Sequence, residues 1–101
     1  MMSKSATTIN PIHPGEVLQE EFMEPLNISA NKLANRIDVP TNRITAIIKG
    51  QRGISGDTAL RLSKVFGTTP EFWINLQGYY EIERAKDNSV ADIQNIEQFA
   101  A

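Results

Sequence analysis

The stretch SANKLANRIDVPTNRITAIIKG, residues 29–50, decides the fold of this chain. Its first half places Leu33 and Ile37 one helical turn apart, and its second half repeats that spacing with isoleucines at Ile44, Ile47 and Ile48. The halves are separated by Asp38-Val39-Pro40, because Asp tolerates the left-handed conformation and a residue before proline is driven out of the helical region. The pattern predicts two short amphipathic helices joined by a tight turn.

Four further residues agree with a helix-turn-helix unit. Ser29 is a good cap for the first helix, and Ala34 is small at the point where the second helix must cross closely. Pro40 suits the opening of the second helix, and Gly50 suits its end. Units of this shape place their second helix in the major groove of DNA, so we interpret the stretch as a DNA-binding motif. The alternative is a helical hairpin that only builds a core.

The polar residues on the outer face of the second helix are the candidates for base contacts. Thr41, Asn42 and Thr45 point away from the isoleucine stripe, near the end that enters the groove. Asn42 can form two hydrogen bonds with an adenine, and the threonines can contact a base edge or a thymine methyl group. Arg43 completes the predicted base-contacting set, and either a guanine or a phosphate would suit it. The residues predicted to hold the phosphate backbone are Lys32, Lys49, Gln51 and Arg52.

The distribution of charge favours this interpretation more than the net charge does. The whole chain carries a formal charge of −2, which is unfavourable for binding a polyanion. Residues 29–64, however, hold seven cations against two acids, a balance of +5, and the remainder holds three cations against ten acids, a balance of −7. Positive charge therefore gathers around the proposed motif. The alternative for each cation is an ordinary solvated side chain.

Length and composition predict one small all-α domain. A chain of 101 residues with 41% hydrophobic residues can bury one modest core. The sequence has no cysteine, which excludes disulfides and thiolate metal sites. It also has no apolar run of ~18 residues and no signal-like N-terminus. We therefore expect a cytoplasmic protein that makes no membrane contact.

Start and stop signals outside the central motif predict three more helices, which makes five in all. Proline suits the first turn of a helix and interrupts its interior, and glycine ends helices. On these grounds the expected helices cover residues 14–24, ended by Pro25, residues 56–67, ended by Gly67, and residues 70–87, opened by Thr69-Pro70-Glu71. A further weak helix is indicated by Val90, Ile93 and Ile96. The expected organisation is a mobile tail over 1–11, a domain over 12–87 and a second tail over 88–101.

Aromatic residues gather in the fifth predicted helix. Four of the seven fall within residues 72–80, on more than one helix face. A small domain cannot easily bury every face of that helix, and an exposed aromatic patch usually marks an interface. Helix-turn-helix proteins usually pair about a two-fold axis. The predicted homodimer surface consists of Trp73, Leu76, Tyr79 and Tyr80. Core filling is the alternative, above all for Phe72 and Trp73.

An enzymatic function has little support in the sequence. His13 is the only histidine, and it is better placed to cap the first helix than to act as a base. No second histidine and no cysteine completes a metal site or a nucleophile pair. We therefore predict no catalytic residue, no metal, no cofactor and no small-molecule substrate.

Three motifs make the sequence resemble a known family. HPGEVLQEEFMEPL over residues 13–26 and VPTNRITAIIKGQRGISGDTALRLSKVFGTTPEFWINLQGYYEIE over residues 39–83 are similar to the HigA-type antitoxins of bacterial toxin–antitoxin modules. These antitoxins belong to the Xre-like, lambda-repressor-like helix-turn-helix group. The likeness covers roughly residues 12–87, and HPGE, TPEFW and NLQ are its distinctive parts. Asp38 stands where the family usually has glycine, a departure that its tolerance of the left-handed conformation accommodates.

The resemblance implies a dimer that binds operator DNA and represses its own operon. It also implies a small basic partner, a toxin endoribonuclease that cleaves mRNA on the ribosome and that the antitoxin neutralises. Glutamates spaced four apart line one face of the first helix, and a basic toxin would suit such a stripe. The candidate toxin-binding residues are Glu16, Glu20, Glu21 and Glu24. A solvated acidic face is the alternative for them.

Two other functions stay open on the sequence alone. A free-standing Xre-type transcriptional repressor would use the same DNA-binding unit without a toxin partner. A protein-interaction adaptor would keep the fold and lose DNA binding, and the cation-rich centre of the chain argues against it.

Overall fold

The protein contains helices, connecting loops and no strand over residues 11–100, which are the residues that the computed structural model describes. Its elements in chain order are α1 (Pro14–Val17), the π-helix η2 (Leu18–Met23), α2 (Ala30–Ile37), α3 (Thr41–Ile48), α4 (Gly56–Phe66) and α5 (Pro70–Ile93). Because η2 continues α1 without a break, the two form the first of five helices, as the sequence predicts. The mobile tail predicted over residues 1–11 lies outside the described residues except for its last position.

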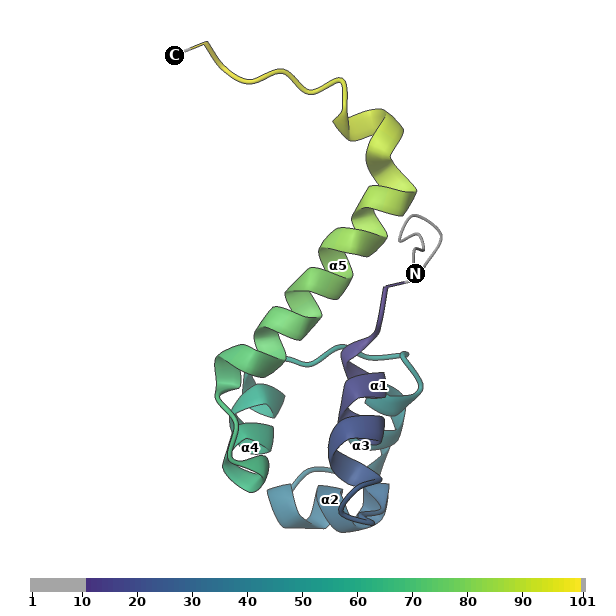
Figure 1. Ribbon diagram of the computed structural model, residues 1–101, viewed down its shortest axis with the longest axis vertical. Coiled ribbons are helices and arrows are strands. Elements are labelled where there is room, and N and C mark those ends of the chain that lie inside the picture. The colour runs from purple at the N-terminus through teal and green to yellow at the C-terminus, as the bar shows by residue number, and fades with distance from the viewer. Residues whose placement is uncertain (1–10, 101) are drawn as a thin grey trace, which may run out of the picture.

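Four of the five helices form a compact body, and the fifth projects from it. In Figure 1 the helices α1 to α4 lie together at one end of the molecule, while α5 begins beside α4 and runs away from the body toward the C-terminus. Within residues 11–100, no helix combines the length and the apolarity that crossing a bilayer requires.

The first helix begins at a histidine cap and changes its pitch midway. The Nδ1 atom of His13 accepts a hydrogen bond of 2.9 Å from the backbone N–H of Gly15, which confirms the predicted capping role. A Cβ atom at Gly15 would collide with the carbonyl oxygen of Ile47, so glycine permits this helix to lie directly on the end of α3. The wider π turn brings Leu18 and Met23, five residues apart, into the same core.

The turn between α2 and α3 has the predicted conformation. Asp38 adopts φ 62° and ψ 51°, the left-handed region in which Asp is tolerated. Val39 packs against the edge of the core, and Ala34 is fully buried where the two helices meet. The side chain of Ser29 accepts a hydrogen bond of 3.1 Å from the backbone N–H of Lys32, so it caps α2 as predicted.

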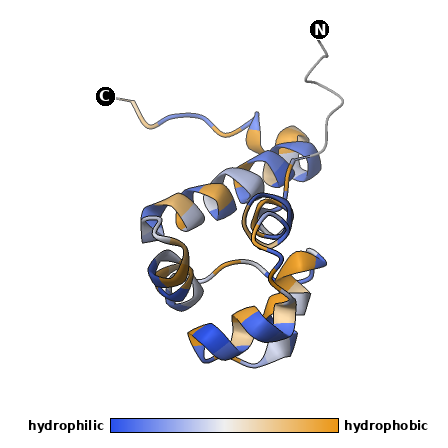
Figure 2. Cartoon of the chain, turned by 60° about the horizontal axis from the view of Figure 1, so that its bottom comes forward, coloured by the Kyte–Doolittle hydropathy of each residue, from blue (hydrophilic) through white to orange (hydrophobic). Residues whose placement is uncertain are grey.

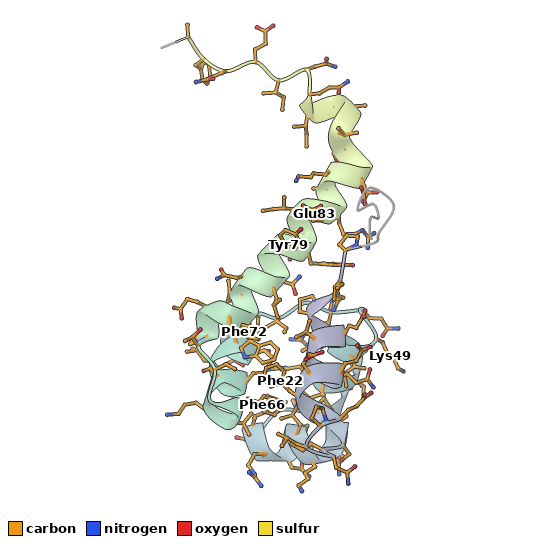
Figure 3. The ribbon with its side chains drawn as sticks, viewed as in Figure 1. Phe22, Lys49, Phe66, Phe72, Tyr79 and Glu83 are labelled. Carbon is orange, nitrogen blue, oxygen red and sulfur yellow. The ribbon has the colours of Figure 1, made fainter. Side chains whose placement is uncertain are left out.

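An aromatic cluster centred on Trp73 closes the core on the side of α5. Its ring centroid lies 4.9 Å from that of Phe22, and Phe66 lies 5.1 Å from Phe22. Figure 3 shows Phe22, Phe66 and Phe72 converging between the first helix and the junction of α4 with α5. Trp73 is 0% exposed, and its Nε1–H donates a hydrogen bond of 2.7 Å to the hydroxyl of Thr68. The prediction that places Trp73 on the dimer surface is therefore wrong, because the first helix and α4 already cover the indole.

The fifth helix is longer than its sequence signals suggest. It is capped by the Thr69 hydroxyl, which accepts a hydrogen bond of 3.1 Å from the N–H of Phe72, and it continues to Ile93, past the expected end near Asp87. The separate weak helix expected around residues 90–96 is thus the last turn of α5 itself, and Ile96 lies beyond it. The segment 79–93 contains no glycine and no proline, so nothing in it interrupts the helix. Figure 2 shows hydrophobic positions recurring along α5 as far as its C-terminal end.

Candidate nucleic-acid interface

The outward face of α3 is fixed by what its inward face buries. Ile44 and Ile47 are both 0% exposed, so the opposite side of this helix must face solvent. That side carries Asn42, which is exposed, with Thr41 and Thr45 half-buried beside it. The three predicted base-contacting polar residues therefore occupy one surface of α3, at its N-terminal half.

The two threonines already have partners within the chain. The hydroxyl of Thr41 donates a hydrogen bond of 2.9 Å to Oδ1 of Asn31 in α2. The hydroxyl of Thr45 donates to the backbone carbonyl of Asn42, at 3.3 Å. Each hydroxyl oxygen keeps acceptor capacity toward solvent. Within residues 11–100 the carboxamide of Asn42 makes no side-chain hydrogen bond, so it is the most available donor–acceptor pair on this face.

Arg43 is held by a network that reaches α4. Its Nη1 atom donates a hydrogen bond of 2.9 Å to Oδ2 of Asp57, and the same oxygen accepts from Nε of Arg61, also at 2.9 Å. Arg61 in turn donates from Nη1 to the carbonyl oxygens of Ile37 and Asp38, at 2.7 and 3.3 Å. The network thus ties α3, α4 and the turn after α2 into one unit.

The electrostatics of this network limit what Arg43 can do. The hydrogen bond from Arg61, followed by that from Arg43, holds the pKa of the Asp57 carboxyl below its usual range, so Asp57 is an anion at neutral pH. One face of the Arg43 guanidinium is therefore occupied by a carboxylate, and its Nε is buried without a hydrogen-bond partner among the described residues. Whether Arg43 meets a guanine or a phosphate, it does so from a position set by α4.

Sequence reasoning missed Asp57 and Arg61 as parts of this site. Their spacing of four residues in a helix is a usable signal for an ion pair within α4. The contact from Asp57 to Arg43, fourteen residues earlier, depends on how α3 and α4 pack, which no local pattern reports.

The predicted phosphate contacts all lie in exposed positions around α3. Lys32 is in the first turn of α2, and Lys49, Gln51 and Arg52 follow the end of α3. In Figure 3 Lys49 projects from the body on the side away from α4. None of the three cations takes part in a salt bridge within residues 11–100, so their charge is available to an anionic ligand.

One acidic residue at the end of the first helix lies next to the candidate DNA-binding surface of α3. Glu16, Glu20, Glu21 and Glu24 are exposed on or just after the first helix, as the predicted stripe requires. Glu24, however, lines a groove of about 310 Å³ that also contains Thr45 and Lys49. The acidic stripe therefore begins beside the candidate DNA surface rather than on a separate face.

The predicted dimer residues on α5 divide between the core and the surface. Leu76 is half-buried against the core, and Tyr80 is half-buried with its ring centroid 4.8 Å from that of His13 in an edge-to-face contact. Tyr79 is 65% exposed, and Figure 3 shows it on the projecting part of α5. Sequence reasoning did not assign Ile82, Val90 or Ile93 to this surface, although all three are at least 50% exposed on the projecting part of α5.

These four exposed side chains share one face of α5. At 100° per residue, Tyr79, Ile82, Val90 and Ile93 fall within about 80° of one another around the helix axis. The spacing was visible in the sequence, but the expected end of the helix near Asp87 concealed it. The described residues leave this apolar face uncovered.

Comparison with known proteins agrees with this architecture. A helix-turn-helix family model matches residues 20–73. A solved HigA-family addiction module antidote protein from Coxiella burnetii is 51% identical, with a TM-score of 0.85 over 90% of this chain and 100% of that one. The Pseudomonas aeruginosa antitoxin HigA, solved with the higBA promoter, is 40% identical, with a TM-score of 0.85 over 89% of this chain and 99% of that one. Virulence-associated protein I of Dichelobacter nodosus is 44% identical over 76% of this chain and 71% of its own length.

The chain therefore belongs to the helix-turn-helix family, a class of DNA-binding regulators rather than of enzymes. Within that family it is a HigA-type antitoxin homologue, as the HPGE, TPEFW and NLQ motifs indicate.

Proposed function

We propose that this chain is a cytoplasmic DNA-binding antitoxin that represses its own operon as a dimer and neutralises an mRNA-cleaving toxin. The observation that carries the DNA-binding part is the outward face of α3, where Asn42 is exposed and where the nearby Lys32 and Lys49 form no salt bridge within residues 11–100. Insertion of this face into the major groove would bring Asn42 to a base edge. The 40% identical Pseudomonas aeruginosa antitoxin HigA has been solved with the higBA promoter, which supports DNA binding by this chain.

The test of DNA binding is a gel shift with DNA from upstream of the chain's own coding sequence. The control is a shuffled duplex of the same length and composition. We expect tighter binding to the upstream DNA, with an affinity that falls steeply as salt rises, because phosphate contacts release counterions. Equal binding to both duplexes would contradict operator recognition, and binding to neither would contradict a DNA-binding function.

We further propose that a second copy of the chain covers the exposed face of α5. The two-fold pairing expected of operator-binding proteins requires such a contact, and this face is an uncovered apolar strip. Sedimentation at micromolar concentration should give a dimer. Ile82→Glu should reduce it to a monomer, while Leu60→Glu, an equally exposed leucine on α4, should leave the dimer intact. A wild-type chain that sediments only as a monomer would contradict the proposal.

The toxin is proposed to bind the acidic stripe of the first helix. A protein that cleaves mRNA must carry basic residues to hold its substrate, and the exposed glutamates from Glu16 to Glu24 supply the complementary charge. The test is co-expression with the product of the neighbouring gene. The double variant Glu20→Lys with Glu24→Lys should lose neutralisation and keep operator binding.

The matched control for this test is Asp87→Lys with Asp92→Lys, which makes the same charge change on α5. If neutralisation survives the substitutions at Glu20 and Glu24, the acidic stripe is not the toxin surface. If the neighbouring gene product does not co-purify with the wild-type chain, a free-standing repressor becomes the better description.

A further inference from the structure

Two residues of the distinctive motifs have no part in the contacts proposed so far. His13 belongs to HPGE and Gln77 belongs to NLQ. Although they lie 64 positions apart, the structure brings both of them against one short segment, the loop Gly50–Ile54 that follows α3. This loop contains two of the predicted phosphate contacts, Gln51 and Arg52, and Lys49 immediately precedes it.

Gln77 holds the far end of the loop. Its side-chain oxygen Oε1 accepts a hydrogen bond of 2.8 Å from the backbone N–H of Ile54. Its Nε2 donates one of 2.8 Å to Oε2 of Glu81, one turn further along α5, which fixes the orientation of the carboxamide. A Cβ atom at Gly53 would lie 2.7 Å from Nε2 of Gln77, so the carboxamide rests directly on a loop backbone that has no side chain there.

The near end of the loop lies beside His13. A Cβ atom at Gly50 would lie 3.9 Å from the imidazole ring, so the ring flanks the loop at this glycine. On its other side the imidazole meets the edge of Tyr80, with ring centroids 4.8 Å apart. The hydroxyl of Tyr80 accepts a hydrogen bond of 2.8 Å from Nη1 of Arg84. Gln77 and Tyr80 are three residues apart, so they project from the same side of α5.

We propose that Gln77, together with Tyr80 acting through His13, positions the loop Gly50–Ile54 for the DNA backbone. Because α5 holds the loop in place before DNA arrives, Gln51 and Arg52 meet the phosphates without the entropy cost of ordering their backbone. Gln77 is thus a positioning residue that acts on DNA through the loop. The inference rests on the proposed DNA-binding function and adds a role for the face of α5 opposite its uncovered strip.

The first variant that tests this role is Gln77→Met, which keeps the size of the side chain and removes both hydrogen bonds. We expect binding to weaken by about three- to tenfold for the upstream operator DNA and for shuffled DNA alike, the scale of one hydrogen bond. The dependence of affinity on salt should become less steep, because the loop loses phosphate contacts. Gln94→Met makes the same change at an exposed position near the end of α5 and should bind as the wild type does.

A conservative exchange should rescue the loop contact. Gln77→Glu combined with Glu81→Gln keeps an acceptor for the N–H of Ile54 and reverses only the direction of the second hydrogen bond. This double variant should bind DNA within about twofold of the wild type. A loss as large as that of Gln77→Met would overturn the assigned hydrogen-bond role.

A double-mutant cycle with Arg52→Ala separates positioning from a general effect on folding. If Gln77 acts through the loop, Gln77→Met should cost much less in the Arg52→Ala background than in the wild type. A loss caused by partial unfolding would have the same size in both backgrounds and would overturn the inference. Unchanged binding by a folded Gln77→Met variant would also overturn it, while a wild-type chain that binds neither DNA would overturn the proposed function itself.

Discussion

The unit formed by α2 and α3 and the long helix α5 show two different ways of presenting a surface. Contacts from two other helices fix the first: α4 places Arg61 on the turn and Asp57 on Arg43, and the first helix packs at Gly15 on the end of α3. Figure 1 shows the part of α5 beyond Tyr80 projecting from the body, and its apolar strip is exposed. A rigid polar face suits base edges whose positions are fixed, and a free apolar face suits a protein partner.

The same contrast exists within α5 itself. Trp73 points into the body and is 0% exposed, whereas Tyr79, six residues later, is 65% exposed. One helix therefore serves as a wall of the core over its first turns and as a free surface afterwards.

The largest effect should come from Trp73→Ala. Removal of a fully buried indole should lower the free energy of unfolding by ~3–5 kcal/mol. Tyr79→Ala on the same helix should change it by less than about 0.5 kcal/mol, because the phenol ring is largely solvated. Urea denaturation at concentrations where the chain is monomeric measures both values. Similar losses for the two variants would mean that α5 does not divide into a buried and a free part.

The next effect is specific to DNA sequence. Asn42→Ala should cost ~1–3 kcal/mol in the free energy of binding to the operator and little on shuffled DNA. Asn88→Ala provides the control, because it removes a carboxamide that is also exposed, but on α5. Titrations of both variants against both duplexes give the comparison. An equal loss of affinity for the two duplexes would show that Asn42 does not contact a base.

A smaller effect should distinguish a cation beside α3 from one on α5 by the salt dependence of DNA binding. Lys49→Ala should weaken binding to every duplex alike and reduce the slope of log affinity against log salt by ~0.9, the value of one phosphate contact. Lys86→Ala, which removes a cation from α5 near Glu83, should leave the slope unchanged. Titrations at several salt concentrations provide the slopes. If Lys49→Ala kept the wild-type slope, this side chain would lie outside the DNA interface.

The smallest effect concerns His13, which lies between the loop after α3 and the helix α5. Burial lowers the pKa of this imidazole from its ordinary value of about 6.5. The unfolded chain then binds more protons than the folded chain, so stability should decline as the pH falls through about 6.5. His13→Asn keeps a capping side chain without a titrating group and should remove part of that decline. Urea denaturation at about pH 8 and about pH 5 tests this, and identical pH dependence in both chains would contradict it.

The helix-turn-helix was predictable because each of its constraints is local. The caps at Ser29 and Thr69, the left-handed Asp38 and the buried isoleucines of α3 all act within a few residues of sequence. Those same isoleucines also fixed which side of α3 faces outward, so the exposure of Asn42 followed without any knowledge of the other helices.

The features that sequence analysis missed depend on contacts between distant residues. Trp73 is buried because Phe22, 51 positions earlier, packs on it. The helix carries aromatic residues on more than one face, and periodicity alone does not tell which of those faces packs against the core. The hydrogen bond between Arg43 and Asp57 likewise joins two helices, and that between Ile54 and Gln77 joins a loop to α5. Local patterns therefore predicted the elements and the outer face of α3, but not the side chains that fix that face in place.

The most direct test of the account is an NMR titration of the isotope-labelled chain with its operator duplex. We predict that the backbone amide signals of residues 41–45 and 49–52 shift most, while those of α5 beyond Tyr80 stay where they are in the free protein. Large shifts confined to α5 or to the acidic stripe, with the signals of α3 unmoved, would contradict the claim that α3 presents the DNA-binding face.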